Sequence, residues 1–248
     1  MKLKDQVAIV TGGGRGIGRA IALRFAAEGA AVTLAATGRD GLEATAKEIR
    51  AQAGRALVAV TDVADEAAVQ SMVAATVREF GRLDILINNS GIAGPTSPVI
   101  EMDRAGWDRT LAVNVTGACL CAKHALPHMI QRKSGRIVNI TSIAGRIGYA
   151  LRSPYAVSKW GMIALTRSLA LETGEHGITV NAIAPGVFPS KMSQGMIGKS
   201  EHVILDQTPL KRLGGDEDLK GIAVLLASEA SAYITGQTIA VDGGMSAV

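Results

Sequence analysis

Aromatic side chains and cysteine are scarce in this sequence. Of its 248 residues, 2 are Trp, 3 are Tyr, 3 are Phe and 2 are Cys. Proteins that bind single-stranded nucleic acid stack the bases on aromatic side chains, so this composition argues against that class. Cys119 and Cys121 stand two residues apart, which in a helix points their side chains away from each other, and no further ligand types cluster nearby. We therefore expect neither a disulfide nor a metal site.

Long apolar runs and a strong charge of one sign are also missing. The first apolar run, residues 7–10, is too short for a signal peptide or a membrane span. The net charge is only +4, and the basic residues are spread along the chain instead of forming a cluster that could hold nucleic acid. The sequence therefore predicts a soluble, cytoplasmic protein that binds neither membranes nor nucleic acid.

Glycine, in contrast, is abundant: its 29 residues are well above the usual share of about 7%. They show no triplet period, which excludes a collagen, and no unit of about 20 to 50 residues repeats, which argues against a solenoid. A hydrophobic content of 48% is ordinary for a packed core. Chains of about 250 residues commonly form one α/β unit, so we expect a single domain over residues 1–248.

Short apolar runs alternate with longer segments of helical period. Val69, Met72 and Val73, for example, recur at the steps of three and four that mark a helix with one buried face. Continuous Val, Ile and Leu runs separated by such helices are typical of a parallel sheet covered on both faces. The sequence therefore predicts an α/β, doubly wound, seven-stranded parallel sheet of the Rossmann type. Its strands are expected at residues 7–10, 31–35, 56–60, 85–87, 137–140, 180–184 and 238–241.

Ligands of such sheets bind beyond the carboxyl ends of the strands, where the strand order reverses. Residues 187–215 lack a strand pattern and are rich in Ser, Lys and Met. We predict that they form a mobile lid over the crevice. The apolar residues of this lid could bind an apolar substrate or simply pack the lid onto the core; they are Phe188, Met192, Met196, Ile197 and Ile204.

A glycine-rich loop directly follows the first predicted strand, and a helical segment with Ile17, Ile21 and Phe25 directly follows the loop. Glycines let the backbone approach a pyrophosphate closely, and the helix N-terminus offers unpaired N–H groups and partial positive charge. A tight turn without a ligand is the alternative, but strand and helix both stand where a dinucleotide site needs them. The loop residues predicted to bind the cofactor are Gly12, Gly14, Arg15, Gly16, Ile17 and Gly18.

The loop pattern Thr-Gly-x-x-x-Gly-x-Gly, from Thr11 to Gly18, resembles that of the short-chain dehydrogenase/reductase family. Further motifs of this family follow in its usual order across nearly the whole chain; they are Asp62-Val63, Asn88-Asn89-Ser90-Gly91, Asn114, Ser142, Tyr155-x-x-x-Lys159 and Pro185-Gly186. Two small departures are Ser90, where Ala is usual, and Ser190, where Thr is common. The resemblance implies a nicotinamide-dependent oxidoreductase that acts on CH–OH groups and is built on a Rossmann fold.

The resemblance also implies which residues bind the dinucleotide. Asp62 and Val63 correspond to the pair that binds the adenine, and Asn89 and Gly91 to the turn beside the adenosine ribose. Tyr155 and Lys159 correspond to residues that contact the nicotinamide half. The stretch expected to flank the nicotinamide comprises Pro185, Gly186, Val187, Phe188 and Ser190.

The end of the second predicted strand bears on the choice between NAD and NADP. In dinucleotide folds an acidic side chain there bonds the ribose hydroxyls of NAD and would repel the additional phosphate of NADP. This sequence has Ala36 at the family's position for that acid, and Asp40 follows four residues later. Arg15 and Thr37 match positions that contact the phosphate in NADP-using relatives, and Arg39 could assist, since guanidinium groups suit phosphate. We expect NADP(H), with NAD(H) the less favoured cofactor.

Tyr155 and Lys159 stand four residues apart in a helical segment, so both side chains project from one face. A nearby ammonium favours the phenolate, so Lys159 is expected to lower the pKa of Tyr155. Tyr155 is then predicted to be the general acid in ketone reduction, as the resemblance also implies. By the same resemblance Lys159 would hold the nicotinamide ribose, Ser142 would hydrogen-bond the substrate oxygen, and Asn114 would position a water that relays protons.

The substrate is less defined. The chain resembles 3-oxoacyl-(acyl-carrier-protein) reductases, especially at Ala36-Thr37, residues 177–181 and residues 233–236, which implies a 3-oxoacyl thioester or a similar ketone. Two alternatives stay open: a sugar-acid or polyol dehydrogenase similar to gluconate 5-dehydrogenase, and a non-catalytic NADPH-binding sensor or scaffold. The helices around residues 114–129 and 155–171 are apolar on more than one face, so we expect a homotetramer, as is usual in the family.

Overall fold

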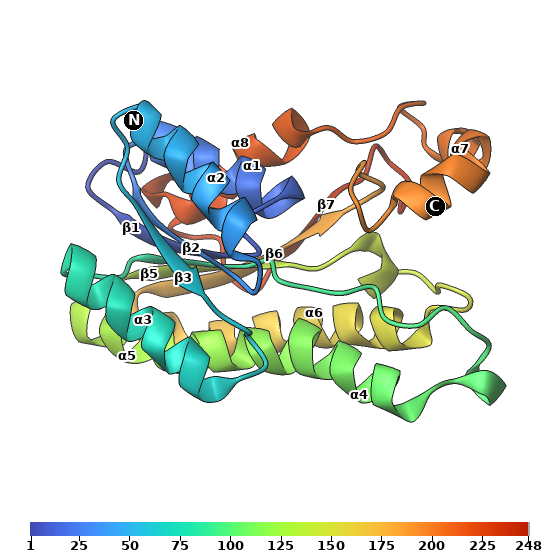
Figure 1. The fold of residues 1–248 in the computed structure, drawn as a ribbon, viewed down its shortest axis with the longest axis horizontal. Coiled ribbons are helices and arrows are strands. Elements are labelled where there is room, and N and C mark those ends of the chain that lie inside the picture. The colour runs from blue at the N-terminus through green and yellow to red at the C-terminus, as the bar shows by residue number, and fades with distance from the viewer. Residues whose placement is uncertain (248) are drawn as a thin grey trace.

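The computed structural model describes residues 1–247, and its centre is a parallel sheet of seven strands (Figure 1). The order across the sheet is β3-β2-β1-β4-β5-β6-β7, and every neighbouring pair is parallel. The strands are β1 (Val7–Thr11), β2 (Ala31–Ala36), β3 (Ala56–Val60), β4 (Ile85–Asn88), β5 (Gly135–Ile140), β6 (Ile178–Pro185) and β7 (Thr238–Val241). All seven predicted strands are present, and several extend one or two residues beyond the predicted bounds.

Helices cover both faces of this sheet, as Figure 1 shows. One face carries α1 (Gly16–Ala27), α2 (Arg39–Ala51) and α8 (Asp216–Ala227), and the other carries α3 (Glu66–Phe80), α4 (Arg104–Leu111), α5 (Gly117–Arg132) and α6 (Ser153–Thr173). The short helical turns are η1 (Val99–Glu101), the π-helical η2 (Ala112–Thr116), η3 (Ile143–Gly145), η4 (Gly174–His176) and η5 (Glu229–Ser231). The predicted doubly wound α/β fold is therefore confirmed. No helix among the described residues is long and apolar enough to cross a lipid bilayer.

The alternation of side chains along each strand divides the core into two apolar clusters. On β1, Ala8 and Val10 pack with the layer of α1, α2 and α8, whereas Ile9 packs with the layer of α3 and α5. β4 repeats this pattern, with Ile87 on the first side and Leu86 on the second. All five side chains are fully buried. Because both faces of the strands are covered, the strands carry continuous apolar runs instead of alternating polar residues.

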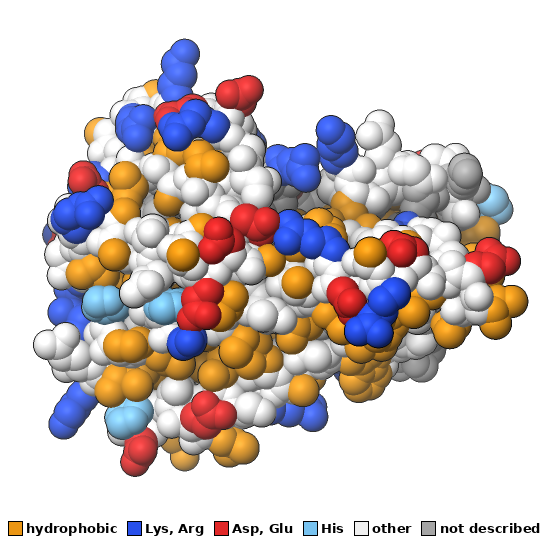
Figure 2. Space-filling view, turned by 60° about the horizontal axis from the view of Figure 1, so that its bottom comes forward, with side chains coloured by type: hydrophobic (Ala, Val, Ile, Leu, Met, Phe, Trp, Pro, Cys, Tyr) orange, Lys and Arg blue, Asp and Glu red, His pale blue; other side chains and the backbone are white. Residues whose placement is uncertain are grey.

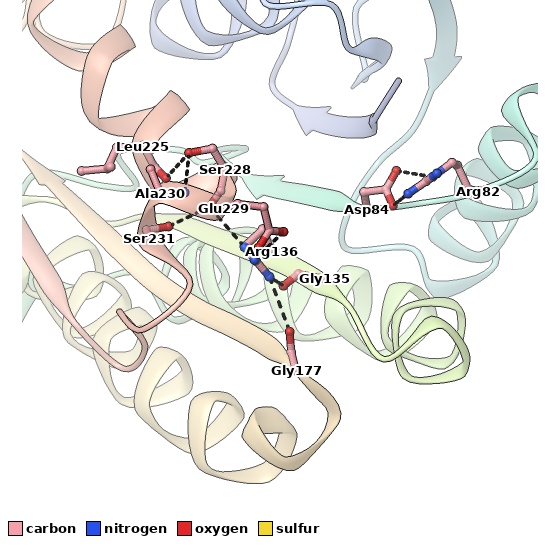
Figure 3. Close-up of polar contacts among 10 residues, drawn as sticks. All are labelled: Arg82, Asp84, Gly135, Arg136, Gly177, Leu225, Ser228, Glu229, Ala230 and Ser231. Atoms are coloured by element: carbon pink, nitrogen blue, oxygen red, sulfur yellow. Dashed lines mark hydrogen bonds and ion pairs between the residues drawn. The ribbon is translucent and has the colours of Figure 1, made fainter. Parts of the chain in front are cut away.

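Two ion pairs and further hydrogen bonds of charged side chains lie at the amino-terminal ends of the strands (Figure 3). The guanidinium of Arg136, on β5, donates to the carbonyl oxygen of Gly177 at 3.4 Å and pairs with Glu229 at 2.9 Å. Arg136 is 6% exposed. Farther along the same edge, Arg82 pairs with Asp84 at 2.6 Å. These contacts tie β5, the turn before β6 and the segment after α8 together at the end of the sheet opposite the expected ligand side.

The predicted lid contains a helix, α7 (Gln194–Gln207), which the sequence pattern does not predict. Phe188 and Ile204 are 8% and 6% exposed, so they pack the segment onto the core. Met192 is 48% exposed. The side chain of Met196 lies outside the described residues. Of the two sequence-based interpretations of the apolar lid residues, packing onto the core therefore accounts for Phe188 and Ile204.

Candidate active site

The carboxyl ends of β1 and β4 meet where the strand order reverses. β2 and β3 continue on one side of β1, and β5 to β7 continue on the other side of β4, so this is the point at which open α/β sheets bind ligands. Hydrogen bonds join the two strand ends. The main-chain nitrogens of Asn89 and Ser90 donate to Oγ1 of Thr11 at 2.9 and 3.0 Å, and Nδ2 of Asn89 donates to the Thr11 carbonyl oxygen at 2.8 Å. Asn89, predicted beside the ribose, thus also fixes the start of the glycine loop.

The glycine-rich loop leaves space that suits an anion. Gly16 has a φ of 51°, which favours glycine, and no heavy atom would lie within 4 Å of a Cβ there. At Gly18, a Cβ would collide with the carbonyl oxygen of Gly12, so that residue packs the loop tightly. α1 begins at Gly16 without a side-chain cap and without an acidic residue in its first turn, whereas Asp65 and Asp103 cap α3 and α4. The N–H groups at the start of α1 are therefore free for a pyrophosphate, and the loop fits a dinucleotide.

The residues predicted to distinguish NADP from NAD lie around the starts of α1 and α2; they are Arg15, Ala36, Thr37 and Arg39. Arg15, Thr37 and Arg39 are exposed, and Ala36, the last residue of β2, is half-buried. Nη1 of Arg39 lies 3.6 Å from Oε1 of Glu43, in an exposed pair of little stabilising value. Asp40 stands in the first turn of α2. Two guanidinium groups are therefore accessible near the end of β2. The position where an NAD site is expected to carry an acidic side chain is occupied by Ala36.

Asp62, predicted to bind the adenine, is held by a partner that the sequence pattern does not reveal. Its carboxylate pairs with Nη2 of Arg109, on α4, at 2.7 Å and accepts the N–H of Ala64 at 3.0 Å. The hydrogen bond from Arg109 is the main reason why the pKa of Asp62 lies below its ordinary value. Val63, 4% exposed, lies against Gly117 at the start of α5. The carboxylate of Asp62 is thus charged and oriented by its own neighbours.

Asn114 lies in the π-helical turn η2 and is 1% exposed. Its Oδ1 accepts the N–H of Ile92 at 2.8 Å, and its Nδ2 donates to the carbonyl oxygen of Ile92 and to Oγ of Ser158, both at 2.9 Å. A Cβ on Gly91 would stand 3.3 Å from Oδ1 of Asn114 and 3.7 Å from Nζ of Lys159. The side chain of Asn114 therefore fastens the loop after β4 to α6, and Ser158 is a supporting residue that sequence reasoning missed.

Ser142 and Tyr155 come together from β5 and α6. Oγ of Ser142 accepts the N–H of Ala144 at 3.2 Å, and the Ser142 hydroxyl lies near enough to the phenol of Tyr155 to lower its pKa. Burial raises the pKa of Tyr155, and the nearby hydroxyl of Ser142 opposes this rise. The pKa of Tyr155 is therefore raised and not lowered as expected, because the loss of hydration outweighs the effects of the Ser142 hydroxyl and of the Arg152 charge.

Lys159 lies one turn farther along α6 than Tyr155. It is 5% exposed; its Nζ donates to the carbonyl oxygen of Ile140 at 2.9 Å and lies 5.6 Å from the centroid of the Tyr155 ring. Burial lowers the pKa of Lys159 to about 8. No carboxylate pairs with it in the part of the chain that the structure describes. A lysine that can exchange a proton near neutral pH thus stands beside Tyr155.

The stretch predicted to flank the nicotinamide follows β6; it comprises Pro185, Gly186, Val187, Phe188 and Ser190. A Cβ on Gly186 would stand 2.8 Å from Cα of Asp242, so only glycine fits between the ends of β6 and β7. Phe188 belongs to the core cluster that includes α8. Oγ of Ser190 lies 3.0 Å from Oγ of Ser193. Ser190 therefore offers a hydroxyl in this stretch, whereas the ring of Phe188 serves packing.

The dinucleotide-type loop at the switch point, with half-buried Ser142 and Tyr155 and buried Lys159 beside it, defines a nicotinamide-dependent oxidoreductase. Residues 12–246 match a family model described as enoyl-(acyl carrier protein) reductase. The chain belongs to the short-chain dehydrogenase/reductase family. It is accordingly an oxidoreductase of the kind that binds NAD(H) or NADP(H).

The relatives of this chain differ widely in substrate. Cis-4-hydroxycyclohexanecarboxylate dehydrogenase of Sinomonas cyclohexanicum is 40% identical, over 98% of both chains. A 3-oxoacyl-(acyl-carrier-protein) reductase of Staphylococcus aureus is also 40% identical, over 96% of this chain and 97% of its own. Among solved structures, a protein of Agrobacterium tumefaciens described as a gluconate dehydrogenase has a TM-score of 0.95 at 38% identity, covering 100% of this chain and 98% of its own. An NAD⁺-bound xylitol dehydrogenase has a TM-score of 0.95 at 34% identity, covering 98% and 100%.

Proposed function

We propose that this oxidoreductase reduces a ketone to a secondary alcohol with NADPH and that Tyr155 is the general acid. The observation that carries the proposal is that the Ser142 hydroxyl and the buried ammonium of Lys159 both lie beside Tyr155, with Nζ of Lys159 5.6 Å from the centroid of its ring. NADPH, when bound, supplies a hydride to the carbonyl carbon. Ser142 holds the carbonyl oxygen by a hydrogen bond, and Tyr155 gives that oxygen a proton as negative charge develops on it. Because burial raises its pKa, the phenol of Tyr155 carries its proton at neutral pH.

We propose that Lys159 returns the proton to Tyr155 after each turnover. Because the pKa of Lys159 is about 8, the ammonium and the amine form are both populated close to neutral pH. The Ile140 carbonyl oxygen and the loop at Gly91 hold its Nζ in place. Asn114 fixes that loop, and a water near Asn114 would connect Lys159 to solvent.

NADP(H), in preference to NAD(H), is the proposed cofactor. Two features support this choice: β2 ends in Ala36 without a carboxylate, and the side chains of Arg15 and Arg39 are exposed near that end. A 2′-phosphate would meet two guanidinium groups there, each able to form charge-assisted hydrogen bonds. The pair between Arg39 and Glu43 is exposed, so its loss would cost little.

Two substrate classes are supported by relatives of comparable similarity. A 3-oxoacyl thioester is supported by the 40% identity to the Staphylococcus aureus 3-oxoacyl-(acyl-carrier-protein) reductase. A hydroxy acid or sugar acid is supported by the equally identical cis-4-hydroxycyclohexanecarboxylate dehydrogenase and by the gluconate dehydrogenase structure. Both classes present a ketone or secondary alcohol to the same Ser142, Tyr155 and Lys159.

The test is the oxidation of NADPH by the purified protein with three groups of ketones: acetoacetyl thioesters, simple cyclic ketones and keto sugar acids. Turnover of thioesters alone supports the first substrate class, and turnover of sugar acids alone supports the second. Tight binding of NADPH without turnover of any ketone would instead support a sensor or scaffold and contradict the proposal. The same assays repeated with NADH test the proposed cofactor preference.

We further propose that the protein is a homotetramer. Exposed residues at steps of three and four form a largely apolar stripe along α6; they are Val157, Trp160, Ala164, Ser168 and Leu171. Trp160 is 52% exposed and Leu171 is 88% exposed. Figure 2, which looks onto the lower helix layer of Figure 1, shows hydrophobic side chains gathered in patches between charged groups. Such patches mark surfaces that another subunit can cover.

A further inference from the structure

Arg152 is unusual among the arginines of this chain. It is half-buried, yet its guanidinium has no hydrogen bond or ion pair within the part of the chain that the structure describes. The other half-buried arginines, Arg19 and Arg82, pair with Glu48 and Asp84, and the buried Arg136 pairs with Glu229. The guanidinium of Arg152 is therefore free to bind an anion from outside the chain by charge-assisted hydrogen bonds.

The position of Arg152 places it at the entrance of the candidate active site. It is the N-cap residue of α6, and its carbonyl oxygen accepts the N–H of Ala156 at 2.9 Å. Arg152, Tyr155 and Lys159 follow each other at steps of three and four, so they share one face of the helix. Exposure rises along this face, from 5% at Lys159 to half-buried Tyr155 and Arg152. The positive charge of Arg152 is close enough to Tyr155 to lower the pKa of the phenol slightly against the effect of burial.

We propose that Arg152 binds a carboxylate of the substrate, a few bonds from the carbonyl group that Tyr155 and Ser142 hold. This inference rests on the proposed function and assigns its substrate class as a keto acid. A planar guanidinium can form two parallel hydrogen bonds with a carboxylate. Arg152 and Tyr155 are separated by about one helix turn, about 5 Å along the axis of α6. The phosphates of a thioester carrier lie at the far end of the pantetheine arm, too distant to be the group that Arg152 binds.

The test compares keto acids with their methyl esters, which remove the charge and keep the ketone. The probes are 3-oxobutanoate, 4-oxopentanoate and 5-oxohexanoate, each with its ester, in NADPH oxidation by the full-length protein. We expect the best acid to exceed its ester by about 10- to 100-fold in kcat/KM, the usual worth of a hydrogen bond to a charged group. Arg152→Gln should lower that acid-to-ester ratio by a similar factor. Arg152→Lys keeps the positive charge but not the two parallel N–H donors of the guanidinium, so it should retain part of the acid-to-ester ratio.

Arg167→Gln is the matched control, since Arg167 is an exposed arginine on the same helix and pairs with no residue that the structure describes. It should leave the ratio unchanged. Equal kcat/KM values for acids and esters in the parent would overturn the inference while leaving the proposed function intact. So would an equal loss for acids and esters in Arg152→Gln, with a shifted pH profile, which would mean that Arg152 only tunes Tyr155. No turnover of any probe would count against the proposed function, and the inference would fall with it.

Discussion

Nζ of Lys159 donates a 2.9 Å hydrogen bond to the carbonyl oxygen of Ile140, and no acid among the described residues shares its site. One neutral oxygen replaces only part of the hydration that a buried ammonium loses. The pKa of Lys159 therefore falls to about 8 from its usual 10.5. The same crevice raises the pKa of Tyr155, so burial moves both groups toward their neutral forms.

Lys159 should make folding stability depend on pH. Between about pH 8 and 10.5 the unfolded chain holds the lysine proton and the folded chain has lost it, so stability rises with pH across that window. Relative to Lys159→Met, the free energy of unfolding of the parent should increase by about 2 kcal/mol from about pH 6.5 to about pH 9.5. Urea titrations at the two pH values measure this. Lys47→Met, at an exposed position, is the control, and its free energy of unfolding should differ from that of the parent by the same amount at both pH values. If the difference between Lys159→Met and the parent were also independent of pH, the assignment would be contradicted.

Tyr155→Phe should remove the proposed acid and keep the ring. We expect kcat/KM for ketone reduction to fall by about 10²- to 10⁴-fold, the usual contribution of a positioned general acid. Binding of NADPH, followed by its fluorescence, should change little. Tyr233→Phe is the control, because Tyr233 is fully exposed. Residual activity within a few fold of the parent would refute the role of Tyr155.

Ala36→Asp should shift the cofactor preference toward NADH. A carboxylate at the end of β2 can accept hydrogen bonds from the ribose hydroxyls of NADH and would repel the 2′-phosphate of NADPH. The ratio of kcat/KM for NADPH to that for NADH should fall by at least about tenfold, a change of about 1.4 kcal/mol. Ala51→Asp, at the exposed end of α2, should leave this ratio as it is. An unchanged ratio in Ala36→Asp would argue against a phosphate site at Arg15 and Arg39.

The strands were predictable because both faces of the sheet are buried, which forces continuous apolar runs such as those of β1 and β4. The glycine loop was predictable because its backbone conformation needs glycine at positions such as Gly16. The pKa of Tyr155 was not, since it depends on how deeply α6 is buried, which the four-residue spacing to Lys159 does not reveal. Contacts between distant segments were also hidden: the pairs of Asp62 with Arg109 and of Asn114 with Ser158 join residues that no local pattern links.

Arg136 should stabilise the amino-terminal edge of the sheet more than its ion pair alone suggests. Arg136→Met keeps the apolar stem but removes the donor to the carbonyl oxygens of Gly135, at 2.9 Å, and of Gly177, at 3.4 Å. The expected loss is about 1–3 kcal/mol in the free energy of unfolding, measured by urea titration. Glu229→Gln should cost less, about 0.5 kcal/mol, because Glu229 is 74% exposed. Equal losses in the two variants would show that the ion pair, and not the main-chain contacts, carries the stability.

Trp160→Glu should disrupt assembly if the apolar stripe of α6 is a subunit interface. A buried Trp contributes strongly to an interface, and a carboxylate in its place would lose its hydration there without gaining a partner. Sedimentation velocity should show the parent as a tetramer and the variant as smaller species at the same concentration. Tyr233→Glu makes a similar change at another exposed aromatic residue and should sediment like the parent. A parent that stays monomeric at every concentration, or a Trp160→Glu variant that sediments with it, would place the interface elsewhere or exclude it.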